Sequence, residues 1–162
     1  MLKQMLDFAV NKYDGSIAIR YPRELYEAEE QSPFEFGKGE VVRKGSEVTI
    51  VTCGSFVSVV SRAVEMSGVD AEIIDVRSIK PLDSELIIKS YNKTGLVITA
   101  EDGVVNGGLG SMVAELLPCK VKKIGYENDF SVPHGSIPEL MEYCKTDAKS
   151  IAEIILKEVS DK

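Results

Sequence analysis

Hydrophobic and polar residues follow two different rhythms along this 162-residue chain. Continuous apolar runs of strand length are separated by segments in which apolar residues recur every three or four positions. Such runs are typical of strands buried on both faces, and the longer spacing is typical of helices with one buried side. The predicted strands are 48–54, 71–77, 95–101 and 121–127. The predicted helices begin near Ser55, near Asp83, and at 107–117, 137–143 and 149–159.

This alternation predicts the fold class. Strands that alternate with helices favour a mainly parallel sheet with right-handed crossovers and helices on both faces, which is a three-layer α/β fold. Local signals support the boundaries: Ser55 is a plausible N-cap, Gly68 is placed to end the first helix, and Pro81 and Asp83 mark the start of the next one. A short strand at 40–43 precedes the first unit.

The N-terminal part of the chain has a different pattern. Residues 2–13 predict an amphipathic helix, and residues 16–21 predict a strand that Pro22 ends. Residues 24–39 begin with an acidic stretch without periodicity and predict a linker. Two interpretations remain open: residues 1–23 are the last helix and strand of a preceding domain, or they pack on the sheet formed by residues 40–162.

Composition limits the function classes. The net charge of −7 argues against nucleic acid as a partner, because phosphate neutralisation needs a surplus of Lys and Arg. Cys53, Cys119 and Cys144 lack metal-ligand spacing, so we expect free thiols in a reducing cytoplasm. No apolar run reaches the roughly 18 residues of a membrane span, and the N-terminus lacks the pattern of a signal peptide.

Three polar features are candidates for chemistry. The loop of Gly107, Gly108 and Gly110 resembles a dinucleotide fingerprint, but Val113 stands where the third glycine belongs, so tight loop-to-helix packing is favoured over an anion site. His134, the single histidine, is either a general acid or base or a structural turn residue. The pair Glu101-Asp102, at the end of a strand, could do acid/base work or bind a metal, but no further ligands lie nearby in the sequence, so loop capping and surface charge are favoured.

A fourth candidate is a pair of arginines. Arg20 and Arg23 flank Tyr21-Pro22 at the end of the predicted strand, and guanidinium groups suit phosphate recognition. Taken alone, each is more typical of an exposed surface arginine.

Several segments together resemble the C-terminal domain of transketolase-type thiamine diphosphate enzymes, and most closely the 1-deoxy-D-xylulose-5-phosphate synthase family. They occur in family order over essentially the whole chain: IRYPR (19–23), GKGEVVRKG (37–45), DVRSIKPLD (75–83), AEDGVVNGGLGS (100–111) and DFSVPHGS (129–136). The central segments are shared across the superfamily, whereas IRYPR and the HGS turn favour the synthases over ordinary transketolases.

The resemblance implies a division of labour. The family's first two domains hold thiamine diphosphate and Mg²⁺, so no catalytic, cofactor or metal residue is expected on this chain. Residues 1–23 would be the end of the pyrimidine-binding domain. Arg23 would contact the phosphate of glyceraldehyde 3-phosphate, although Glu24 stands where the family usually has glycine. The third domain would also contribute to a homodimer interface.

The resemblance also leaves rivals. The chain could be the C-terminal subunit of a split transketolase, or a non-catalytic interaction module that contributes only to dimerisation. The isolated chain is expected to be inactive, because its catalytic partners are the thiamine-binding domains.

Overall fold

The structure is a computed structural model that describes residues 1–22, 32–127 and 132–162. Within these residues five strands form one sheet in the order β1-β3-β2-β4-β5. The four strands β3, β2, β4 and β5 run parallel in three pairings, and the edge strand β1 pairs antiparallel with β3. The strands are β1 (Glu40–Arg43), β2 (Val48–Thr52), β3 (Ala71–Asp75), β4 (Val97–Val104) and β5 (Lys122–Tyr126).

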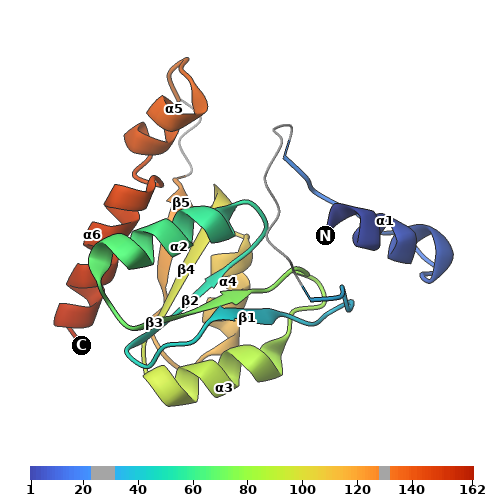
Figure 1. Ribbon diagram of the computed structural model, residues 1–162, viewed down its shortest axis with the longest axis horizontal. Helices are drawn as coiled ribbons and strands as arrows, with labels where there is room; N and C mark the ends of the chain where they lie inside the picture. The colour runs from blue at the N-terminus through green and yellow to red at the C-terminus, as the bar shows by residue number, and fades with distance from the viewer. Residues whose placement is uncertain (23–31, 128–131) are drawn as a thin grey trace.

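Helices cover both faces of this sheet, so the predicted three-layer α/β fold is confirmed (Figure 1). The helices are α1 (Leu2–Asn11), α2 (Phe56–Ser67), α3 (Ser84–Thr94), α4 (Leu109–Leu116), α5 (Ile137–Tyr143) and α6 (Ala148–Ser160). On one face α2 and α6 pack against the sheet, and on the other α3 and α4 do so. The mainly parallel sheet and the order of strands and helices along the chain match the alternation of the sequence.

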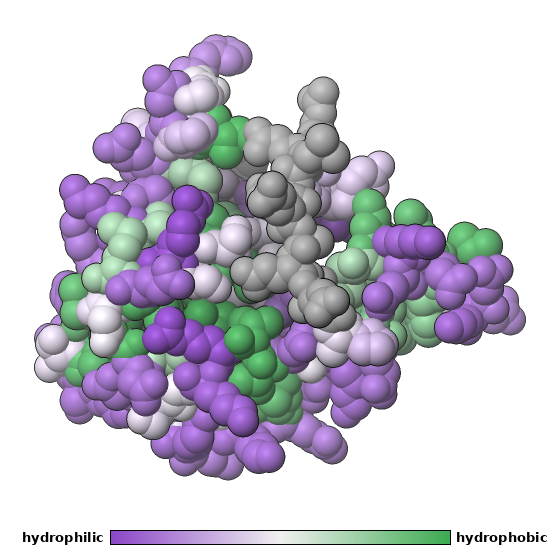
Figure 2. Space-filling model, viewed as in Figure 1, coloured by the Kyte–Doolittle hydropathy of each residue, from purple (hydrophilic) through white to green (hydrophobic). Residues whose placement is uncertain are grey.

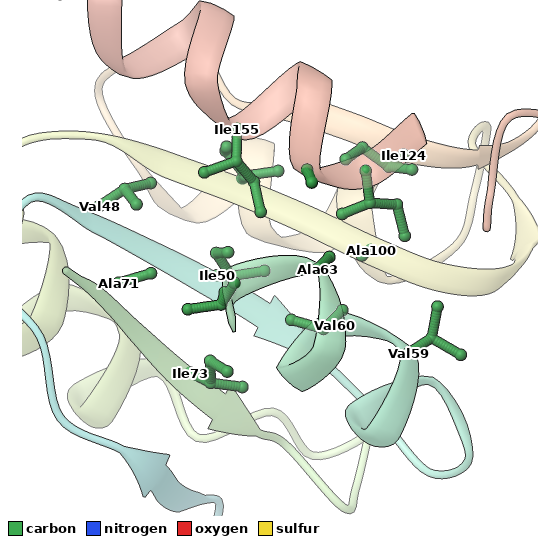
Figure 3. Close-up of a cluster of buried hydrophobic side chains, with 14 of the residues drawn as sticks. Val48, Ile50, Val59, Val60, Ala63, Ala71, Ile73, Ala100, Ile124 and Ile155 are labelled. Carbon is green, nitrogen blue, oxygen red and sulfur yellow. The ribbon is translucent and has the colours of Figure 1, made fainter. Parts of the chain in front are cut away.

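The core follows from the alternation of side chains along buried strands. In β2, Ile50 points into the layer of α2 and α6, whereas its neighbour Val51 points into the layer of α3 and α4. Figure 3 shows the first layer, in which Val60 of α2 and Ile155 of α6 lie over Ile50. All residues of β2 and β3 are buried, as expected for strands covered on both faces.

The local signals read from the sequence have mixed outcomes. Gly68 ends α2 in the left-handed region with φ of 69°, and the Asp83 side chain accepts a hydrogen bond from the Leu86 backbone N–H at the start of α3. Ser55 is the residue before α2 as predicted, but its side chain makes no capping bond. Strands β2 and β3 end two residues before their predicted limits, and β4 extends three residues beyond.

The N-terminal segment corrects one prediction. Helix α1 forms, but residues 16–22 form no strand in the part of the chain that the structure describes. A strand needs a neighbouring strand to exchange backbone hydrogen bonds with. Ile17, which belongs to the apolar side of the predicted strand, is exposed. The alternating pattern therefore predicted a conformation that these residues do not adopt without a pairing strand.

Helix α1 stands apart from the sheet (Figure 1) and packs on the residues that lead into the domain. Phe8 stacks on Phe36 with 5.0 Å between ring centroids and meets Phe34 edge-on at 5.7 Å. Tyr13 completes the aromatic cluster, 5.3 Å from Phe36. The predicted alternative of packing directly on the sheet is therefore not what α1 does. Among the described residues, none of the helices has the length and apolar character to cross a membrane.

Candidate functional site at the carboxyl edge of the sheet

The carboxyl ends of the parallel strands bring polar side chains together at one edge of the sheet. Cys53 follows β2, Asp75 ends β3, and Glu101 and Asp102 lie in β4. Burial raises the pKa of the Cys53 thiol to about 11, and the negative charges of Asp75, Glu101 and Asp102 add to the effect. Ligands of open α/β sheets bind at this edge, so it is the candidate functional site.

Glu101 of this edge binds the glycine loop. Its two carboxylate oxygens accept hydrogen bonds from the backbone N–H groups of Leu109 and Gly110, each at 2.8 Å. The side chain is an internal anion at the N-terminus of α4, where the helix dipole favours negative charge. Glu101 is only 5% exposed, so these two bonds hold an otherwise costly buried carboxylate.

Gly108 makes this arrangement possible. A Cβ atom on residue 108 would lie 2.1 Å from Glu101 Oε2 and 2.8 Å from Cδ of the same side chain. The backbone of Gly108 itself is extended, with φ of −90°, so space and not conformation requires glycine there. The loop is therefore a packing element that receives an internal carboxylate, in agreement with the interpretation favoured from the sequence.

Asp102 points in the other direction and contacts the N-terminal segment. Arg20 Nη2 donates to Asp102 Oδ2 at 3.0 Å, and Nη1 donates to the backbone carbonyl of Asp102. Burial first, and then the charge of Asp102, raises the pKa of Tyr126 to about 12. The predicted pair Glu101-Asp102 is thus divided between helix capping and an ion pair.

A second arginine contacts the residues that lead into the domain. Arg77 adopts a left-handed backbone with φ of 52° just after β3, and its side chain is buried between the carboxylates of Glu40 and Asp75. Its Nη1 donates to Ser32 Oγ at 3.0 Å. Burial lowers the pKa of Arg77, and burial likewise raises that of Asp75. Arg77 thus ties the linker to the end of β3.

The sequence interpretation treated Cys53 only as a free thiol and did not single out Asp75 or Arg77. One signal was available, because charged residues directly after a fully apolar strand lie at the carboxyl edge. Of the residues that were singled out, Arg20 and Asp102 are in contact, whereas Glu101 binds the glycine loop. His134 lies exposed in the turn before α5.

Arg23, the predicted phosphate-binding residue, lies outside the described residues. Pro22 is the last described residue before it. Arg20 lies three positions before Arg23 in the sequence, and its contact with Asp102 is the side-chain contact nearest to Arg23 along the described chain.

The described residues offer a poor fit to a diphosphate and its magnesium ion. No group of three or more His, Cys, Asp or Glu side chains placed to hold a metal is found among them. The backbone N–H groups at the start of α4, the natural cradle for a phosphate, already bind Glu101. No step of a thiamine-dependent reaction is therefore assigned to side chains of the described residues.

Comparison with known proteins identifies the family. Residues 37–151 match the family model described as "Transketolase, C-terminal domain". The chain belongs to the transketolase C-terminal domain family. The matched residues span the sheet, the glycine loop and most of the helices described above. The resemblance read from the sequence motifs is thus confirmed for this domain.

Relatives and solved structures are consistent with this membership. A 1-deoxy-D-xylulose-5-phosphate synthase of Heliobacterium modesticaldum is 38% identical over 99% of this chain, which corresponds to 26% of the relative. A putative transketolase C-terminal section of Methanocaldococcus jannaschii is 37% identical over 93% of this chain and 50% of the relative. A split-gene transketolase, described as an inactive β4 tetramer, superposes with a TM-score of 0.72 at 36% identity, covering 80% of this chain and 44% of that one.

The transketolase C-terminal domain described here spans about a quarter of the synthase and half of the archaeal section. A solved transketolase of Pichia stipitis shares the fold at 20% identity, with a TM-score of 0.58.

The three free cysteines, Cys53, Cys119 and Cys144, are all partly buried, which fits the free thiols expected from their spacing.

Proposed function

We propose that this chain is the C-terminal domain of a thiamine-diphosphate-dependent 1-deoxy-D-xylulose-5-phosphate synthase. The observation that carries the proposal is the set of synthase relatives, of which three are 36–38% identical over 89–99% of the chain. The motifs IRYPR and HGS, which favour synthases over ordinary transketolases, support the same choice.

The proposed reaction belongs to the complete enzyme. Pyruvate loses CO2, and its remaining two-carbon unit is added to glyceraldehyde 3-phosphate, which gives 1-deoxy-D-xylulose 5-phosphate, a precursor for isoprenoids and thiamine. Thiamine diphosphate and Mg²⁺ supply the chemistry of decarboxylation and would be held by the two preceding domains. This domain would bind substrate phosphate and contribute to a homodimer, and its free thiols suit the reducing cytoplasm.

Arg23 is the residue proposed to bind substrate. A guanidinium group contacts phosphate through paired, charge-assisted hydrogen bonds. Binding a phosphate away from the reacting carbonyl fixes the orientation of the aldehyde, which lowers the entropy cost of the addition. The described contact of Arg20 with Asp102 supports this role, because it ties the same short motif to the candidate site.

The proposed domain boundaries assign residues 1–23 to the preceding domain and 24–39 to the linker. Apolar side chains of α1 and the residues after it are exposed, and Figure 2 shows several of them in green at the right of the molecule. The exposed side chains on α1 include Leu6 at 49% and Val10 at 79%, and Tyr21, after the helix, is 64% exposed. Exposed apolar side chains gathered on one helix are typical of a surface that another element covers. The rest of the pyrimidine-binding domain would cover it.

The test is a product assay on the complete enzyme. Pyruvate and glyceraldehyde 3-phosphate are supplied with thiamine diphosphate and Mg²⁺, and the sugar product is identified by mass spectrometry. The proposal predicts 1-deoxy-D-xylulose 5-phosphate and release of one CO2 per product. The same mixture with this chain alone is expected to give no turnover, and turnover there would contradict the division of labour.

A second candidate is the C-terminal subunit of a split transketolase. The archaeal section and the split-gene structure favour it, since their identities of 37% and 36% are nearly those of the synthases. Mixing with an N-terminal partner would then restore ketol transfer from a ketose phosphate, and pyruvate would not serve as donor. A non-catalytic dimerisation module, the third possibility, predicts no binding of a phosphate analogue and no effect of Arg23→Ala.

A further inference from the structure

We infer that the groove between β1 and α3 binds a small organic anion, in which a phosphate or carboxylate group is joined to a short apolar body. The two elements lie side by side (Figure 1), and the groove has a volume of about 330 Å³. Ligand pockets in proteins have volumes of about 300–1,000 Å³, so the groove suits a small molecule. None of its residues belongs to the candidate site at the carboxyl edge, so the inference goes beyond the proposed function and does not depend on it.

Three lysines give the groove its positive charge. Lys44 follows β1, whereas Lys89 and Lys93 lie on α3. Because Lys89 and Lys93 are four positions apart, they share one face of the helix and repel each other. Lys44 adds a third positive charge from a different element. The chain as a whole has a net charge of −7, so the groove is a local excess of positive charge that an anion would relieve.

One carboxylate also lines the groove and opposes the binding of an anion. Glu72 is only 6% exposed, and its two oxygens accept hydrogen bonds from Ser90 Oγ and Lys93 Nζ. Lys93 therefore neutralises Glu72. Among the residues that the structure describes, no ion pair is found for Lys44 or Lys89. The groove thus keeps two positive charges for a ligand.

Two apolar side chains favour a ligand with an apolar body. Val41 of β1 and Leu86 of α3 line the groove, and both pack in part against the core layer of α3 and α4. Inorganic phosphate would leave this apolar surface in contact with water, whereas a short alkyl chain would cover it. Each fully buried CH2 group raises affinity up to about fourfold. The groove should therefore prefer an alkyl phosphate to phosphate alone.

The experiment is a titration of the whole isotope-labelled chain, followed through its backbone NMR signals. Butyl phosphate is expected to shift the signals of Lys89 and Ser90 saturably and to bind about tenfold more tightly than inorganic phosphate. Butylammonium, which has the same chain and the opposite charge, is expected not to bind.

Two lysine variants test the source of the affinity. Lys44→Gln and Lys89→Gln should each weaken binding of butyl phosphate about fivefold, which corresponds to about 1 kcal/mol. Both lysines are exposed, so their replacement leaves the core intact. Lys157→Gln is the matched control: it removes the same charge from an exposed position of α6, across the sheet, and should leave the affinity unchanged.

Several results would overturn the inference. Butyl phosphate that does not bind saturably, or that binds no more tightly than inorganic phosphate, refutes it. If Lys157→Gln weakens binding as much as Lys89→Gln does, the affinity reflects overall charge and not the groove. Signals that shift only at the start of α4 would place the anion at the glycine loop instead.

A membrane surface is the other source of phosphate groups. Because the chain is acidic overall, we expect it to stay in the supernatant when vesicles of dioleoylphosphatidylglycerol are sedimented. Sedimentation with the vesicles that Lys89→Gln abolishes would assign the lysines to a lipid surface and refute the small ligand. Failure in any of these tests leaves the product assay of the complete enzyme, and with it the proposed function, unaffected.

Discussion

Replacing Gly108 by alanine tests the internal carboxylate of the glycine loop. The new Cβ would lie 2.1 Å from Glu101 Oε2, so the carboxylate has to leave the backbone N–H groups of Leu109 and Gly110. Hydrogen bonds to a charged group contribute about 1.5–3 kcal/mol each. Water recovers part of this loss at a helix end, so we expect the free energy of unfolding to fall by about 3 kcal/mol.

Gly107→Ala is the matched control one residue earlier. Gly107 has φ of 81° and nothing within 4 Å of its would-be Cβ, so alanine there brings strain without a clash. That strain costs about 1–2 kcal/mol. A second control removes the partner: in a Glu101→Ala background, Gly108→Ala should cost less than about 0.5 kcal/mol, because the clash is gone.

The assay is urea unfolding of the chain, monitored by far-ultraviolet circular dichroism. All variants are compared with the same dependence of unfolding free energy on urea concentration. The reasoning is refuted if Gly108→Ala destabilises the protein no more than Gly107→Ala does. It is equally refuted if the Gly108 and Glu101 substitutions are additive, since that would mean that the two residues do not interact.

Three further predictions concern the core, a helix cap and a thiol. Ile87→Ala, at a fully buried position, should lower the free energy of unfolding by about 3 kcal/mol. Ile88→Ala, at a position 39% exposed, should lower it by less than about 1 kcal/mol. Equal losses in urea unfolding would contradict the described packing of α3. Asp147→Ala should cost about 1 kcal/mol, because its carboxylate accepts from two backbone N–H groups at the start of α6, and an unchanged unfolding midpoint would contradict this cap. Cys53 should react with iodoacetamide at pH 8 far more slowly than free cysteine, because a pKa of about 11 keeps its thiol in the unreactive protonated form. The reaction should become faster as the pH rises toward 11. Rapid labelling at pH 8, detected by mass spectrometry, would contradict the burial of Cys53.

The layers of the fold were predictable because each rests on local pattern. Strands β2 and β3 are continuous apolar runs, and the three-to-four spacing in α2 and α6 leaves one side for the core. The pairing order was not predictable from such patterns, because β1 pairs with β3 across a whole intervening strand and helix. The false strand at 16–21 has the same cause: alternation shows that a segment can pair, and not whether a partner is present.

The candidate site was predictable only in part. The pair Glu101-Asp102 and Arg20 were visible as charged residues at predicted strand ends. Their partners depend on three-dimensional arrangement, since Glu101 binds residues eight and nine positions later while Asp102 binds one 82 positions earlier. Arg77 was missed because its importance comes from burial beside Asp75 and Glu40, which the sequence does not display.

The most direct test of the proposed role of this domain is the preference of the complete enzyme for a phosphorylated acceptor. We would measure kcat/KM with pyruvate for glyceraldehyde 3-phosphate and for glyceraldehyde, in the unaltered enzyme and in Arg23→Ala. A guanidinium–phosphate contact worth about 1.5–3 kcal/mol predicts that the ratio of the two values falls about 10- to 150-fold in the variant. An unchanged ratio, or an enzyme that does not use pyruvate at all, would contradict the proposed function.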